Sequence, residues 1–187
     1  MSSISQFRKN KLMYVFNVFF DVNSSGTIDK KDFEIAIERF CNLRGWSGDS
    51  EKVEKTRSCL LKVWDGLQSG ADKDQDGQVT QDEWCAMWDE FSKNPSAPQE
   101  WQTHYMNFMF DLVDTSGDGS IDEAEFCEVC QNNGVPGAEA ADAYKRFSKD
   151  GTVQVSRDEF AKYWVEFFSS EDPMALGNFI FGKTSFN

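Results

Sequence analysis

The sequence predicts an all-α fold of four helix-loop-helix units, paired into two lobes. A carboxylate-rich stretch of twelve residues recurs at 21–32, 72–83 and 114–125, and a weaker copy lies at 148–159. Apolar residues with helical spacing flank every copy, and each copy is followed directly by an aromatic residue. An internal repeat of this kind predicts that each copy forms the same local structure.

The segments between the copies predict the helices in chain order. They cover 7–20 and 33–43 around the first copy, 51–71 and 84–93 around the second, 101–113 and 126–133 around the third, and 138–147 and 160–168 around the fourth. The stretch 94–99 contains Pro95 and Pro98 and is the candidate boundary between lobes. The expected organisation is therefore an N-terminal pair at 1–94, a C-terminal pair at 99–168 and an apolar tail at 169–187.

The second and third copies contain the ligand pattern of a calcium loop. Calcium takes six to eight oxygen ligands, and a twelve-residue EF-hand loop supplies them from positions 1, 3, 5, 7, 9 and 12, with glycine at position 6. Gly77 and Gly119 occupy position 6. The candidate ligands are Asp72, Asp74, Asp76, Gln78 and Glu83 in the second copy, and Asp114, Ser116, Asp118, Ser120 and Glu125 in the third. An acidic turn that is exposed to solvent and binds no metal would not require the EF-hand residue types at so many fixed positions at once.

The first copy fits the same pattern with a shorter last ligand. Its candidate ligands are Asp21, Asn23, Ser25, Thr27 and Asp32. An aspartate at position 12 is one methylene shorter than glutamate and favours a single oxygen contact. We therefore expect calcium at all three loops, with magnesium competing most at 21–32.

The fourth copy is expected not to bind metal. When Glu159 is aligned with position 12, Ser148 stands at position 1 and Val153 at position 6. Glu159 can still cap the helix that follows, because position 9 and position 12 resemble a capping box in all four copies. Position 8 carries Ile28, Val79, Ile121 and Val155, so the first loop is expected to pair with the second and the third with the fourth.

Several other patterns are given structural interpretations. GNFIFGKT at 177–184 matches a phosphate-binding loop in letters only, because a helical repeat rather than a strand precedes it. The apolar tail is expected to fill a groove between the lobes; the alternative is a segment that binds a membrane or a partner. His104 is expected to be structural, and Cys127 and Cys130 to be two buried thiols.

Charge and composition exclude other classes. The net charge of -13 argues against nucleic acid and anionic membranes as partners. The chain shows no signal sequence, membrane span or lipidation motif, so we expect a cytoplasmic protein without a stable membrane anchor. We also expect a monomer without enzymatic activity.

The residues resemble those of the calexcitin and invertebrate sarcoplasmic calcium-binding protein family. The resemblance covers nearly the whole length, including FDVNSSGTIDKKDFEIAI, ADKDQDGQVTQDEW and GNFIFG, and also VWDGL, which no metal requires. It implies a compact protein with three occupied hands, a silent fourth and a tail packed into the body. It also implies an ion channel or a calcium-release channel as a possible protein target.

Three functions follow from these observations. The first is a neuronal-type calcium signalling protein, as the resemblance implies, and the second is a cytosolic calcium and magnesium buffer. The third, a photoprotein or luciferin-binding protein, is disfavoured because such proteins use several pocket histidines, whereas this chain has one. A content of 6 methionines against 17 phenylalanines favours a closed core over a sensor groove rich in methionine.

Overall fold

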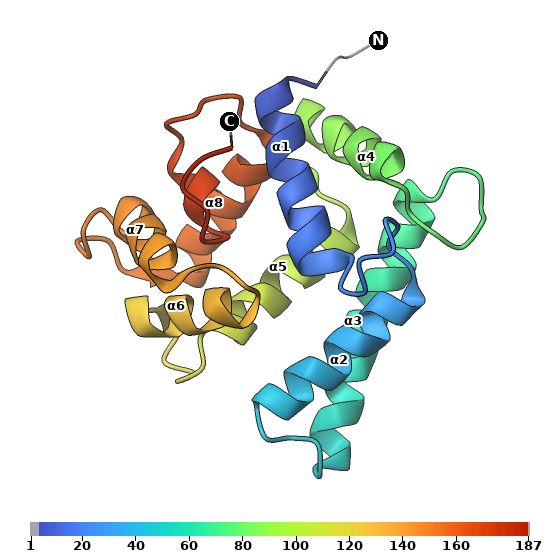
Figure 1. Cartoon of the computed structure of the whole chain (residues 1–187), viewed down its shortest axis with the longest axis horizontal. Helices are drawn as coiled ribbons and strands as arrows, with labels where there is room; N and C mark the ends of the chain where they lie inside the picture. Colours follow the sequence, from blue (N-terminus) through green and yellow to red (C-terminus); the bar gives the residue numbers. More distant parts are fainter. Residues whose placement is uncertain (1–3, 187) are drawn as a thin grey trace.

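The computed structural model describes residues 4–186, and its fold is all-α, as predicted (Figure 1). The helices are α1 (Gln6–Val15), α2 (Lys30–Leu43), α3 (Ser50–Ala71), α4 (Gln81–Lys93), α5 (Glu100–Val113), α6 (Glu123–Asn132), α7 (Gly137–Phe147) and α8 (Arg157–Ser169). Two short strands, β1 (Ser120–Ile121) and β2 (Val155–Ser156), and two short helices, η1 (Phe16–Phe20) and η2 (Leu176–Phe179), complete the described elements.

The first expected helix ends in a turn that the sequence did not predict. Residues 16–20 form a π-helix, which closes with a hydrogen bond from the Asp21 amide to the Phe16 carbonyl at 2.8 Å. This turn directs Phe20 onto Trp84 and Tyr105, with ring centroids 4.7 and 4.6 Å apart. The entry into the first loop is thereby fixed by aromatic packing.

The loops pair as predicted. Ile28 and Val79 exchange backbone hydrogen bonds of 2.9 and 2.8 Å, which joins the first loop to the second. β1 and β2 form an antiparallel pair in which Ile121 lies opposite Val155, and this pair joins the third loop to the fourth.

The helices on either side of 94–99 share one core. In Figure 1, α2 and α3 extend together to the lower right, while α6, α7 and α8 lie on the left. α3 nevertheless packs against α5, and a Cβ at Gly66 would lie 2.2 Å from the Cβ of Trp101. Trp88 of α4 stacks on Phe168 of α8 with centroids 3.7 Å apart. The division into lobes at 94–99 therefore stays a prediction.

The C-terminal tail docks between α1 and α8. Phe179, Ile180, Phe181 and Phe186 are buried. The Tyr14 hydroxyl donates to the Phe181 carbonyl at 2.9 Å. The same residues give no support to a phosphate-binding loop, because 176–179 are a 3₁₀-helix and Gly177 lies against the backbone of α8.

A buried lysine joins the tail to the first helix. Lys11 is 0% exposed, and its Nζ donates to the Ser170 carbonyl at 2.8 Å and to Asn178 Oδ1 at 2.9 Å. Burial, assisted by repulsion from Arg8, lowers the pKa of Lys11 to about 8, although Glu171 and Glu166 oppose the shift. The folded protein therefore holds this charge less readily than the unfolded chain does.

We expect Lys11 to make stability rise with pH. Between pH 8 and 10.5 the unfolded chain retains a proton on Lys11 that the folded protein has lost, so stability increases through this window. The free energy of unfolding of the wild type, minus that of Lys11→Met, should rise by up to about 3 kcal/mol from pH 7.5 to 10.5. Urea unfolding at several pH values measures the difference. A difference that stays constant with pH would contradict the expected shift.

Other residues singled out in the sequence are structural or lie at the surface. The Nε2 of His104 lies 3.3 Å from Glu100 Oε1 on the exposed face of α5. Cys130 is buried, as expected, but Cys127 is partly exposed, because it sits at the edge of the buried face of α6. None of the helices within residues 4–186 is both long and apolar enough to span a bilayer.

Candidate metal centres

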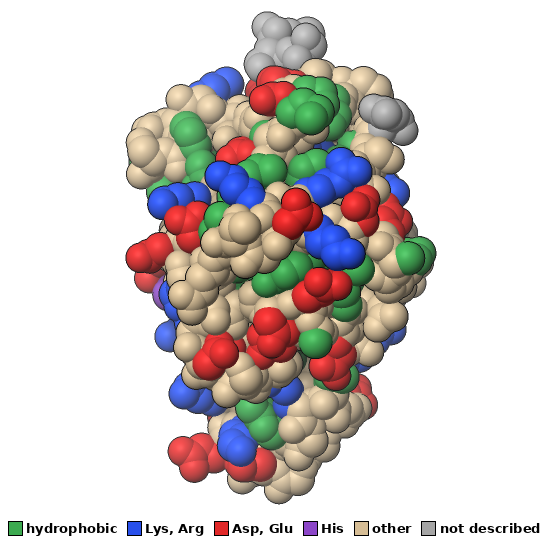
Figure 2. All heavy atoms as spheres, turned by 90° about the vertical axis from the view of Figure 1, so that its left-hand side faces the viewer, with side chains coloured by type: hydrophobic (Ala, Val, Ile, Leu, Met, Phe, Trp, Pro, Cys, Tyr) green, Lys and Arg blue, Asp and Glu red, His purple; other side chains and the backbone are tan. Residues whose placement is uncertain are grey.

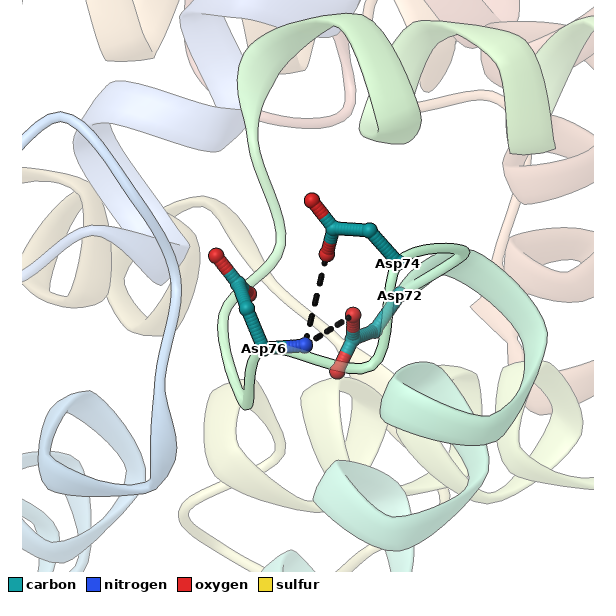
Figure 3. Close-up of side chains that lie close together, drawn as sticks. All are labelled: Asp72, Asp74 and Asp76. Carbon is teal, nitrogen blue, oxygen red and sulfur yellow. Dashed lines mark hydrogen bonds between the residues drawn. The ribbon is translucent and has the colours of Figure 1, made fainter.

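The second loop brings three acidic side chains together (Figure 3). Carboxylate oxygens of Asp72, Asp74 and Asp76 lie within 4.8 Å of one another. The Asp76 amide donates to Asp72 Oδ1 at 3.2 Å and to Asp74 Oδ1 at 3.3 Å. Like charges this close repel, and a divalent cation would relieve the repulsion. The donor set is made of hard oxygen atoms, which fits calcium.

The same backbone path recurs in the first three loops. Gly26, Gly77 and Gly119 at position 6 have φ of 90°, 85° and 86°, in the left-handed region that favours glycine. Each of their amides donates to the aspartate at position 1 of its loop, at 2.8 to 3.0 Å. The turn glycine therefore positions the first carboxylate of its loop.

The residue at position 12 folds back over its loop in all three cases. Glu83 accepts from the amides of Lys73 and Thr80, both at 2.9 Å. Glu125 accepts from Ser116 at 2.9 Å and from Asp122 at 3.0 Å. These bonds complete the capping boxes that the sequence predicts, and they aim each carboxylate at its loop.

The charges of the second loop are unevenly stabilised. Burial raises the pKa of Asp72, but hydrogen bonds from Gly77, Gln68 and the Asp76 amide outweigh it, so the pKa is lowered. The pKa of Asp74 is raised by burial first and then by the nearby charges of Asp76 and Glu83. Hydrogen bonding thus favours the charged form of Asp72, whereas the surroundings of Asp74 disfavour its charged form.

The first loop is held in the same way by a shorter side chain. Asp32 is 1% exposed, and its two oxygens accept from Asn23 at 3.3 Å and from Asp29 at 2.9 Å. Burial is the main cause of its raised pKa. Ser25 Oγ lies 3.3 Å from Asp21 Oδ1, which keeps these two predicted ligands together.

The third loop differs at position 1, where Asp114 is half-buried, whereas Asp21 and Asp72 are buried. Ser116 Oγ lies 3.4 Å from Asp114 Oδ1, and the Ser120 hydroxyl lies 3.2 Å from Asp118 Oδ1. Glu125 is buried, whereas Ser116 and Asp118 are exposed. The predicted ligands thus form two hydrogen-bonded pairs under the position-12 carboxylate.

The fourth loop closes on itself. Ser148 is fully buried, and its hydroxyl accepts from the Gly151 amide at 3.1 Å. Lys149, Asp150 and Gly151 are consecutive left-handed residues, so the backbone takes a different path from that of the other loops. Ser156 caps α8 as predicted, but the carboxylate of Glu159 bonds to Lys162 instead of completing a capping box.

Two contacts beside the loops escaped the sequence analysis. The Thr27 hydroxyl donates to Gln78 Oε1 at 2.7 Å, which links the position-7 residues of the first two loops. Arg44 donates to the carbonyls of Asp111 and Leu112 at 2.7 and 2.9 Å and so caps the end of α5 just before the third loop. Only the basic charge of Arg44 near a helix end could have suggested its contact.

Comparison with known proteins agrees with this geometry. Residues 18–35 match the EF-hand model, and residues 104–165 match the model of an EF-hand domain pair. Calexcitin-1 of Caenorhabditis elegans is 30% identical, over 99% of this chain and 91% of that protein. The chain belongs to the calexcitin and sarcoplasmic calcium-binding protein family.

Other members of the family support the assignment. Sarcoplasmic calcium-binding proteins I, III and IV of Branchiostoma lanceolatum are 27% identical, over 96% of this chain and 98% of theirs. The solved structure of a sarcoplasmic calcium-binding protein from amphioxus superposes with a TM-score of 0.87 at 25% identity, covering 97% of this chain and 99% of that one. The amphioxus protein is a calcium-binding protein with the EF-hand fold.

Proposed function

We propose that this protein binds three calcium ions, at 21–32, 72–83 and 114–125, and acts as a calcium signalling protein of calexcitin type. The observation that carries the site assignment is the shared geometry of these loops, in which glycine amides and position-12 carboxylates arrange the same donor set three times. The fourth loop lacks that geometry.

Titration calorimetry tests the number of sites. Calcium added to the protein in the presence of magnesium should bind at the second and third loops at micromolar or lower concentrations, with the first loop weaker. Fewer than two calcium sites would contradict the assignment.

Magnesium is proposed to compete at the first loop. Replacing Asp32 with glutamate adds the methylene that a bidentate contact needs, so calcium affinity at this loop should rise about ten-fold relative to magnesium. Competition titrations with both ions measure the ratio. The reverse change in the second loop, Glu83→Asp, is the matched control and should lower its preference for calcium; unchanged ratios in both variants would contradict the role of side-chain length.

A buffer is the second candidate function. The docked tail favours it, because Phe179, Phe181 and Phe186 fill space that a calcium sensor would expose. An apolar dye distinguishes the two functions: its fluorescence should increase with calcium for a signalling protein and stay constant for a buffer. Capture of a channel fragment only in the presence of calcium would identify a target.

The proposal also covers the cellular setting. All five cysteines are unpaired, which suits the reducing cytoplasm. The side of the molecule in Figure 2 carries acidic and basic side chains interspersed, with apolar groups in small separate patches, which suits a monomer. The net charge of -13 disfavours nucleic acid as a partner.

A further inference from the structure

An apolar pocket of about 280 Å³ lies between α2 and α5 and is lined in part by Phe19, whose ring contacts Phe181 of the docked tail with centroids 5.0 Å apart. Its wall includes the buried side chains of Phe20, Phe33, Leu60 and Tyr105, which come from four different elements. The tail borders the pocket at Phe19 and otherwise contacts α1, α6, α7 and α8, and no described segment fills this space. The pocket is therefore part of the fold and open to an external ligand.

The mouth of the pocket is exposed and apolar on one side. Leu43 at the end of α2 is 48% exposed, and within residues 4–186 Met174 is the only other large apolar side chain that is exposed. Phe40 and Phe108 line the pocket together with Leu43. Their ring centroids are 5.2 Å apart, and both side chains are only partly buried. An apolar chain entering here would cover side chains that the protein otherwise leaves in water.

The other side of the mouth is polar and carries a free positive charge. Arg39 lines the pocket and makes no ion pair with any residue in the described range, and the polar side chains of Asn132 and Asn133 also line the pocket. The one acidic residue in the lining is Asp32, whose oxygens already accept from two amides. A negatively charged head group would thus meet Arg39, with Asp32 as the one acidic side chain that also lines the pocket.

The size of the pocket limits the ligand. At about 280 Å³ the pocket lies near the lower end of the roughly 300–1,000 Å³ that is usual for small-molecule sites, which favours a small ligand with a short alkyl chain. We propose that the pocket binds a free medium-chain carboxylic acid, with the alkyl chain between α2 and α5 and the carboxylate at Arg39. This site adjoins the first of the proposed calcium loops, because Val22 and Asp32 belong to that loop and also line the pocket.

Calorimetry with octanoate tests the proposal on the calcium-loaded full chain. Burial of a seven-carbon alkyl chain predicts one site with a dissociation constant on the order of 0.1 mM. Ala36→Phe places a ring in the pocket and should weaken binding at least about ten-fold. No binding of octanoate to the wild type at millimolar concentrations, or equal binding to Ala36→Phe, would overturn the proposal.

The head-group contact has its own variant and control. Arg39→Gln should weaken octanoate about two- to five-fold, as expected for an exposed charge pair, and leave the binding of octan-1-ol unchanged. Arg57→Gln, on α3 and outside the pocket, should change neither. Equal octanoate affinity in the two arginine variants would contradict the position of the carboxylate. Binding to phosphatidylserine vesicles in place of free octanoate would contradict the choice of a free acid.

Calcium titrations of the same samples separate this proposal from the assignment of the loops. A variant that retains the calcium binding of the wild type is folded, so its loss of octanoate reports on the pocket alone. A wild type that binds octanoate but not calcium would contradict the loop assignment and leave the pocket supported.

Discussion

Removal of calcium should lower the free energy of unfolding by about 4 kcal/mol for each occupied loop, when the free ion had been present at about 1,000 times the dissociation constant. The physical reason is that the ion binds the folded loop and screens carboxylates that otherwise repel, such as those of Asp72, Asp74 and Asp76. Three occupied loops would make this the largest change available to the molecule. Thermal unfolding with calcium and with excess chelator measures it.

Three glutamine variants assign the effect to individual loops. Glu83→Gln and Glu125→Gln remove the position-12 charge of the second and third loops, and each should remove about one site's share of the calcium-dependent stabilisation. Glu159→Gln makes the same change in the fourth loop and is the matched control, because its carboxylate contacts Lys162 instead of a loop. An equal loss of calcium response in all three variants would contradict the assignment of the silent loop.

Removal of one buried aromatic side chain from the docked tail should have the second largest effect on the free energy of unfolding. The Phe181 side chain is 2% exposed, and its ring contacts those of Phe19 and Phe167 with centroids 5.0 and 4.7 Å apart. Phe181→Ala should therefore lower the free energy of unfolding by about 3–5 kcal/mol, through lost burial and the cavity that remains. Urea unfolding in saturating calcium measures the change.

The same tail provides a control for this substitution. Met174 is 78% exposed, so Met174→Ala should change stability by less than about 0.5 kcal/mol. If the two variants were equally stable, the tail would not be docked in solution. Greater fluorescence of an apolar dye with Phe181→Ala than with Met174→Ala would show that the aromatic groove had opened.

Sequence reasoning predicted the loops because two independent patterns coincide in them. Oxygen-bearing residues recur at fixed positions around Gly26, Gly77 and Gly119, and apolar residues with helical spacing flank each loop. Few other structures satisfy both patterns, so the fold class and the loop pairing could be predicted together. The assignment of individual ligands stays a prediction.

The remaining features depend on contacts between distant segments. The charges of Arg8 and Lys11 would place their helix face in water, yet both are buried, at 4% and 0% exposure, against the ends of α4 and α8 and the tail. The π-turn at 16–20 has nearly the same apolar spacing as an α-helix, so sequence periodicity does not reveal it. The pocket at Arg39 exists only because α2 and α5 approach each other without filling the space between them.

If calcium binds at the three loops as proposed, the closed fourth loop should make the two loop pairs respond differently to a calcium pulse. Ile28 and Val79 join the two proposed calcium loops of the first pair through their backbones, so this pair should saturate steeply. The third loop is joined through Ile121 and Val155 to a loop closed by its own serine, so it should follow a simple hyperbola with a Hill coefficient of about one. A graded response and a threshold response would then coexist in one polypeptide.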